Sequence, residues 1–179
     1  ATFTPTANVV SGTANISLNA GTYTDAAGNT GSAGTTPSLT YSTSTPTVSQ
    51  VGLSSATGAV NNLLNTGDVI FAKVVFSEAI VLNATGGSPT LNLMIGSTLV
   101  QATYVSGSGS TDFVFSYTIL AAQEDANGIS IPSAAITLNG STLKSEPGNS
   151  LTLGNASVAD NILYPVDTTA PSVVITSAV

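Results

Sequence analysis

Residues 112–119 read DFVFSYTI, the clearest β-strand signal in the chain. Large apolar side chains occupy every second position, and smaller or polar side chains lie between them. One face therefore carries Phe113, Phe115, Tyr117 and Ile119. A period of two residues is typical of a strand with one face on a core and the other towards solvent. The stretch predicts a half-buried strand.

A second strand is predicted where the chain reads DVIFAKVVF, at 68–76. Lys73 is expected to face water. Successive side chains of a strand point to opposite faces, so the even-numbered residues of this stretch are expected to face the core. The predicted core-facing set is Ile70, Ala72, Val74 and Phe76.

Further apolar runs separated by Gly- and Asn-rich turns predict an all-β chain. They lie at 48–54, 90–95, 99–105, 129–138 and 150–158. No segment has a convincing helical period. Seven or so short strands in roughly 100 residues is typical of a β-sandwich. We predict an immunoglobulin-like sandwich.

Composition excludes several classes of protein. The 179 residues contain two Lys or Arg against nine Asp or Glu, and no His, Cys or Trp. Two Lys cannot neutralise a phosphate track, which argues against nucleic-acid binding. Catalysis by His or Cys is impossible. Glu124 and Asp125 are adjacent and would face opposite sides of a strand, which argues against a paired acid–base role. No apolar run is long enough for a membrane-spanning helix.

An internal repeat predicts tandem modules. YSTSTPTV at 41–48 matches VDTTAPSV at 166–173, and TYTDAAGNTG at 22–31 matches TLKSEPGNSL at 142–151 more weakly. Residues 1–46, with strand candidates around 1–4, 14–18 and 38–41, are too few to bury a core alone. We therefore divide the chain into three parts. They are the C-terminal part of one module (1–46), a complete module (47–166), and the joint and first strand of a third (167–179).

These residues resemble a known family. ATFTPTAN (1–8), AGTYTDAAGNTGSAG (20–34) and VDTTAPSVVITS (166–177) resemble the tandem immunoglobulin-like repeats of giant bacterial surface adhesins and biofilm-associated proteins. GDVIFAKVVFSEAIVL (67–82) is similar to another repeat type of such proteins. The resemblance implies extracellular extender modules on the bacterial cell surface, with calcium commonly stiffening the joints.

A set of acidic residues is predicted to converge at the end of the complete module. An immunoglobulin-like topology places their loops at the boundary with the third part. The set comprises the carboxylates Asp68, Glu124, Asp125, Asp160 and Asp167, with the amide residue Asn127 in the same loop as Glu124. Calcium takes about 6–8 oxygen ligands, so these side chains are candidate ligands. The alternative is that they are ordinary solvated turn residues.

A second candidate group lies in the repeated loop. Asp25 and Asn29 belong to the first copy, and Glu146 belongs to the second, near Glu78. The matched stretches 41–48 and 166–173 are the two predicted joints between modules. The first joint carries Ser42 where the second carries Asp167, so calcium is less expected at the first joint. An Asx turn with Gly28 at positive φ is the alternative interpretation of this loop.

Three functions fit these observations. The first is a non-catalytic structural extender whose partners are neighbouring modules of the same chain, with any host or surface ligand bound elsewhere in the full protein. The second is a self-assembling filament or surface-layer subunit, in which 171–179 of one copy completes 1–46 of the next by donor-strand addition. The third, a carbohydrate-binding module, is less expected because no loop combines aromatic with acidic and amide side chains.

Overall fold

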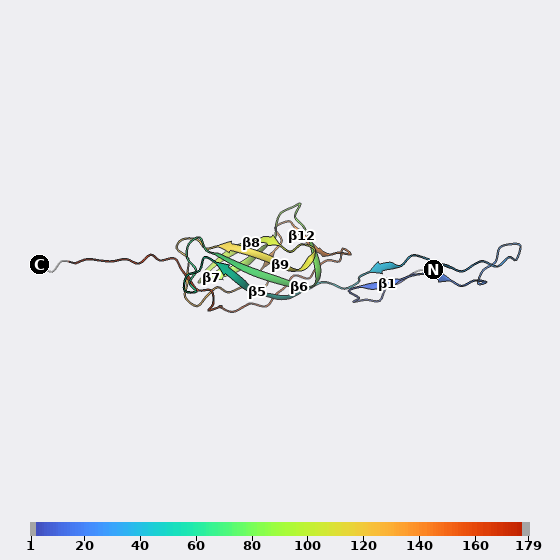
Figure 1. Ribbon diagram of the computed structural model, residues 1–179, viewed down its shortest axis with the longest axis horizontal. Helices are drawn as coiled ribbons and strands as arrows, with labels where there is room; N and C mark the ends of the chain where they lie inside the picture. The colour runs from blue at the N-terminus through green and yellow to red at the C-terminus, as the bar shows by residue number, and fades with distance from the viewer. Residues whose placement is uncertain (1–2, 177–179) are drawn as a thin grey trace. The chain divides into compact units, whose positions relative to one another are not determined.

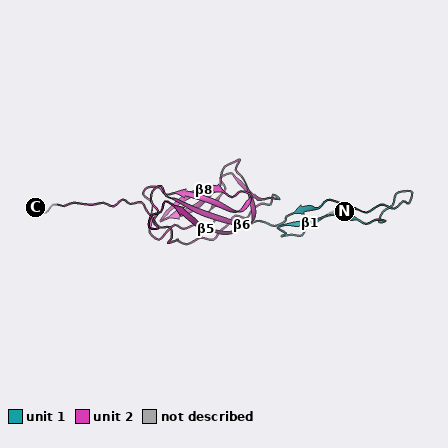
Figure 2. Cartoon of the chain, in the orientation of Figure 1, with its two compact units in different colours: residues 1–45, 147–149 teal, residues 46–146, 150–179 magenta. Residues whose placement is uncertain are grey.

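A computed structural model describes residues 3–176, and all of its regular structure is β. The chain forms two compact units (Figure 2). Unit 1 is Ala1–Thr45 with Pro147–Asn149, and unit 2 is Pro46–Glu146 with Ser150–Val179. The prediction of an all-β chain is confirmed, whereas the division into three modules stays a prediction.

Unit 2 is built on a seven-stranded antiparallel sheet (Figure 1). The strands are β5 (Val48–Thr57), β6 (Val69–Asn83), β7 (Thr90–Ile95), β8 (Thr98–Ser106), β9 (Ser110–Thr118), β11 (Ile136–Thr137) and β12 (Thr142–Ser145). They run in the order β11-β7-β8-β9-β6-β12, and β5 also pairs with β6. A separate pair joins β10 (Glu124–Asp125) to β13 (Val166–Asp167).

The sheet curls because β6 is long and changes its partner along its length. Its first half, Val69–Phe76, pairs with β5, and its last residues, Ile80–Asn83, pair with β12. The register with β9 shifts between Val75 and Ile80. Such an irregularity bends a strand and increases its twist. The curl lets both ends of β6 contribute to one core.

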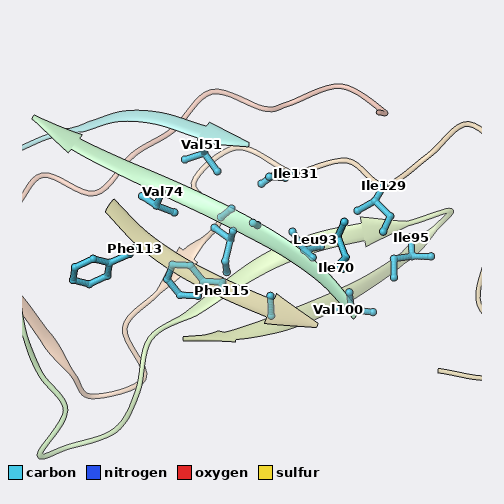
Figure 3. Packing of buried hydrophobic residues seen from close by; sticks show 14 of the residues in the cluster. Val51, Ile70, Val74, Leu93, Ile95, Val100, Phe113, Phe115, Ile129 and Ile131 are labelled. Carbon is cyan, nitrogen blue, oxygen red and sulfur yellow. The ribbon is translucent and has the colours of Figure 1, made fainter. Parts of the chain in front are cut away.

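The buried apolar residues of unit 2 form one core cluster, part of which Figure 3 shows. Ile70, Ala72 and Val74 are fully buried, as the alternation in 68–76 predicts. Phe113 packs edge to face on Phe76 and Tyr104, with ring centroids 5.0 and 5.2 Å apart. Segments after β9 close the core from the other side, through the buried residues Ile119, Ile129, Ile131 and Val166.

Lys73 lies on the outer face of β6, as predicted. Its ammonium group donates to the carboxylate of Asp112, 2.9 Å away, and both side chains are 43% exposed. This hydrogen bond is the main reason that the pKa of Asp112 lies below its ordinary value.

Several predicted strands are shorter than expected. Residues 150–158 form only isolated bridges, Thr47 with Thr152, Ile131 with Val158 and Lys144 with Ser150. Within 129–138 only Ile136–Thr137 is a strand. Residues 3–4 and 171–176 belong to no strand, and the rest of the expected strands at 1–4 and 171–179 lies outside the described residues. The backbone groups of β6, β7, β8 and β9 already pair with one another, so few remain to form a ladder with these segments.

Within the described residues 3–45, the strands of unit 1 form only short two-stranded ladders. They pair β1 (Gly12–Ala14) with β4 (Leu39–Tyr41), and β2 (Ser17–Leu18) with β3 (Gly34–Thr35). The ring of Tyr41 covers Gly12, where a Cβ atom would overlap it, and meets Phe3 edge to face. No residue from 3 to 45 is buried. Isolated two-stranded ladders are marginally stable in water, so unit 1 by itself lacks the core that a stable domain needs.

The edges of the large sheet are short or irregular. The edge strand β11 has two residues, and β5 carries two register shifts against β6, at Val48/Gln50 and at Leu53/Ser55. Short and bulged edges offer little template for pairing with another chain.

Two stretches of the chain share one local structure at a constant offset. Residues 14–30 align with 134–150 without a gap when 120 is added to each number. Identical residues are Ala14, Ile16, Leu18, Asn19, Thr22, Gly28 and Asn29 with Ala134, Ile136, Leu138, Asn139, Thr142, Gly148 and Asn149. The bridge between Thr24 and Thr30 recurs between Lys144 and Ser150, at the same offset. Sequence repeat and backbone pairing therefore agree.

Candidate functional site

The site that the sequence predicts lies where the chain leaves the sheet of unit 2. The strand β13 pairs with β10 on one side, so that Asp167 faces Glu124 across the ladder. On the other side Leu64 holds the same strand: its amide donates to the carbonyl of Pro165, and its carbonyl accepts from the amide of Asp167, each at 2.9 Å. The departing chain is thus fixed between two segments that are far apart in sequence.

Glu124 binds the two threonines that follow β13. One carboxylate oxygen, Oε1, accepts from the Thr168 amide at 2.9 Å and from the Thr169 hydroxyl at 2.8 Å. The Thr168 hydroxyl lies 3.1 Å from the same oxygen and 3.0 Å from the carbonyl oxygen of Gln123. These bonds, that of Thr169 above all, hold the pKa of Glu124 below its ordinary value. The carboxylate therefore clamps the joint residues 168–169.

Asp125 points the opposite way, as adjacent positions on a strand require. It is 4% exposed, and both of its oxygens accept backbone amides, from Gly96 at 2.7 Å and from Gly128 at 2.9 Å. Gly128 has a φ of 93°, and a Cβ atom there would overlap the carbonyl oxygen of Asn161. Asp125 therefore fixes the loop from β10 to the core, and that loop accepts only glycine at 128.

Asp68 and Asp167 line one pocket at this end of unit 2. The pocket has a volume of about 270 Å³ and is also lined by Asn65, Thr169, Val60, Asn61 and Leu63. Asp68 accepts the amide of Asn65 at 2.7 Å, and Asp167 accepts the amide of Thr169 at 3.0 Å. The two carboxylates are thus aligned by their own turns on the wall of a shared cavity.

The other candidate residues lie in separate places. The amide group of Asn127 donates to Asp160. Glu78 lies on β6 and Glu146 follows β12, at the end where Ile80 pairs with Ser145. In unit 1, Asp25 accepts from the amide of Ala27 and from both the backbone and the side chain of Asn29, each at 2.9 Å. The bonds from Asn29, its side chain first, lower the pKa of Asp25, and Gly28 has a φ of 87°.

The candidate carboxylates therefore do not form one common site. Glu124, Asp125 and the pair Asp68 and Asp167 lie at one end of unit 2, but each has its own partners. Across residues 3–176, no three acidic side chains lie close enough together to hold a metal ion. The same residues include no helix that is long and apolar enough to cross a membrane. Calcium binding stays a prediction.

Sequence reasoning did not assign a role to Thr168 and Thr169. Both residues stand in the matched joint, where Thr168 aligns with Thr43. In unit 1 the Thr43 hydroxyl donates to the carbonyl of Thr6 at 2.6 Å and accepts the amide of Val9 at 3.0 Å. The repeated threonine was the signal: in both units its hydroxyl ties the joint to a preceding loop.

A pH titration tests the Glu124 clamp. Because the folded pKa is lowered, its contribution to stability is complete above the ordinary value of 4.5 and is lost as pH falls through the lowered folded value. We expect the Thr168 amide to lose protection from hydrogen exchange below about pH 4.5, and Glu124→Gln to show weakened protection already at pH 7. Asp112→Asn serves as a control, because it removes the other lowered carboxylate of unit 2 without touching the joint. Protection of Thr168 that is the same at pH 3 and pH 7 would contradict the clamp.

Comparison with known proteins identifies one family, for part of the chain. Residues 1–43 match the family model described as a bacterial Ig-like domain. No curated protein and no solved structure matches the chain. The match supports the predicted immunoglobulin-like fold, and its residues all lie in unit 1.

Proposed function

We propose that this chain is a non-catalytic structural repeat from an extended, extracellular protein of the bacterial cell surface, of the adhesin or biofilm type. Modules of this kind act by adding length in series. The match of residues 1–43 to a bacterial Ig-like domain and the offset of 120 residues between the two units support a tandem array.

One observation carries the proposal: the chain enters and leaves unit 2 at opposite ends of its sheet. It enters at Val48, which pairs with Phe76, and leaves at Val166, which bridges to Leu64 beside the start of β6. Seven residues of strand separate Phe76 from Val69, or about 23 Å. Chain termini of a domain often lie close together, so this separation favours a module that adds length to an array.

Force spectroscopy tests this function. We expect four copies of the 179-residue chain, fused head to tail and pulled from their ends, to give evenly spaced unfolding events. Each unit 2 should release roughly 400 Å of chain, given about 3.4 Å per extended residue. A control with Phe113→Ala in one copy should lose or weaken one event. Smooth extension without discrete events would contradict the proposal that unit 2 resists force as a folded module.

We propose calcium at the pocket of Asp68 and Asp167 as the ion that stiffens the joint. Its support is that Asp68, Asp167 and Asn65 line the same pocket, because carboxylate and amide oxygens suit a hard cation that keeps several waters. Extracellular modules of this type bind calcium at about 0.1–1 mM.

The calcium proposal predicts a modest thermal shift. At 10 mM calcium and a Kd of about 1 mM, the linkage relation gives about 1.4 kcal/mol, or about 3–5 °C in Tm against a chelator. Asp167→Asn should abolish the shift, whereas Glu146→Gln, away from the pocket, should keep it. Equal Tm values in calcium and chelator would remove the ion and leave the structural repeat standing.

A further inference from the structure

Unit 1 exposes several large apolar side chains. We call this set the open face, and it comprises Phe3, Ile16, Leu18, Tyr23 and Leu39, which are 41–57% exposed. Phe3, Ile16 and Leu39 also line a pocket of about 280 Å³ with Ala14, Asn15, Thr36 and Pro37. Apolar patches of this kind on a small unit mark a contact surface.

Unit 2 contains the same segment in a complete setting. Ile136, Leu138 and Leu143 stand 120 residues after Ile16, Leu18 and Tyr23, and all three pack in or against the core. Leu143 is 6% exposed, whereas Tyr23 is 49% exposed. The positions that unit 1 leaves open are therefore the positions that unit 2 covers.

One edge of the segment contacts the stretch that follows the repeated loop in both units. In unit 1 the Ile16 amide donates to the Thr36 hydroxyl at 2.9 Å, and β2 pairs with β3. In unit 2 the Ala135 amide donates to the side-chain oxygen of Asn155 at 2.8 Å. At the offset of 120 residues Ala135 corresponds to Asn15, so the two units contact this stretch through neighbouring and not equivalent positions.

The other edge is where the two units differ. In unit 2, Ile136 pairs with Leu91 of β7, and Leu143 pairs with Leu82 of β6. Within residues 3–45, no strand pairs with the corresponding edge at Ile16 or Tyr23. In unit 2 this segment is therefore covered by the last residues of β6 and the first residues of β7. We call strands that would take the same places on unit 1 β6-type and β7-type strands.

We propose that the open face of unit 1 is a docking surface for two β-strands of the β6 and β7 type, supplied by a copy of the 47–120 segment. The leucines of the incoming strand, equivalent to Leu91 and Leu93, fill the pocket beside Ile16, and the equivalent of Leu82 covers Tyr23. Main-chain pairing to a sheet edge supplies affinity, and alternate side chains in pockets supply specificity. This inference rests on the tandem-repeat part of the proposed function.

A designed fusion tests the docking surface. A second copy of residues 47–120 is placed directly before Ala1 of the full 179-residue chain, which restores the spacing of 120 residues. Amide hydrogen exchange is then compared between the fusion and the unmodified chain. We expect exchange at 16–18 and 22–25 to slow by about 100-fold or more, because strand pairing converts exposed amides into a cooperative unit. Exchange in the original unit 2 should not change.

Three variants of the fusion serve as controls. Replacing the added equivalents of Leu91 and Leu93 by Asp, or Ile16→Asp in unit 1, should remove the protection at 16–18. Val174→Asp, which changes an 84% exposed residue of unit 2, should keep it.

Three results would overturn the proposal. The first is unchanged exchange at 16–18 and 22–25, whether or not the added segment is itself protected. The second is protection that survives the Asp substitutions. The third is protection of these amides in the unmodified chain that rises with its concentration while the pairing of β6 and β7 within each copy is unchanged, because a surface other than these strands would then cover the face. Force peaks from unit 2 would remain in each case, so failure of docking is distinguishable from failure of the structural repeat.

Discussion

Replacing Phe113 with alanine should lower the free energy of unfolding of unit 2 by about 3–5 kcal/mol, the usual cost of removing a buried phenylalanine. Phe113 is fully buried, and its ring packs edge to face on Phe76 and Tyr104. The substitution leaves a cavity between β6, β8 and β9, because three strands paired on both edges cannot move together to fill it. Urea unfolding followed by tyrosine fluorescence measures the loss.

Leu99→Ala is the matched control for this substitution. Leu99 lies on β8 in the same sheet, but it is 55% exposed, so the expected change is within about 0.5 kcal/mol. A loss from Phe113→Ala no larger than that from Leu99→Ala would contradict the position of Phe113 in the core.

Replacing Asp125 with alanine should cost about 3–4 kcal/mol, although the residue lies in a two-residue strand at the end of the unit. Its carboxylate is buried and accepts the amides of Gly96 and Gly128. Hydrogen bonds to a charged group contribute about 1.5–3 kcal/mol each, and deletion also leaves the amide of Gly128 buried without its acceptor. We expect the loss in chemical denaturation and, more locally, in hydrogen exchange at Gly96 and Gly128.

Two further variants separate this role from charge alone. Asp125→Asn keeps one acceptor oxygen but turns an amide towards the other donor, so its expected cost is lower, about 2 kcal/mol. Asp160→Ala removes an exposed carboxylate of the same end of the unit, with an expected change within about 0.5 kcal/mol. Equal stability of the Asp125 and Asp160 variants would show that Asp125 does not organise the loop.

The sequence predicts the part of the fold that alternation encodes. DVIFAKVVF and DFVFSYTI have one apolar face each, and Ile70, Val74 and Phe113 are buried accordingly. Alternation cannot predict β12, which reads TLKS, or β10, which reads ED. These short strands exist because β6 and β13 run beside them, and long-range pairing leaves no pattern in four or two residues.

The candidate site, too, is predicted by the sequence only in part. Adjacency on a strand predicts that Glu124 and Asp125 face opposite sides, and one is exposed while the other is buried. The order of the strands likewise predicts that Asp68 and Asp167 lie at the same end of unit 2. The sequence could not predict that Thr168 and Thr169 donate to Glu124, or that the amide of Gly96 donates to Asp125, because these partners lie 29–45 residues away along the chain.

The short β11 and the two register shifts of β5 have a consequence for crowding along an array. In the tandem array proposed above, neighbouring repeats joined by a short linker would meet at effective concentrations in the millimolar range. A long straight edge under those conditions would exchange strands with its neighbour and trap misfolded pairs. With only two lysines in the chain, charge cannot keep such edges apart. In the proposed array the short and bulged edges would do so instead.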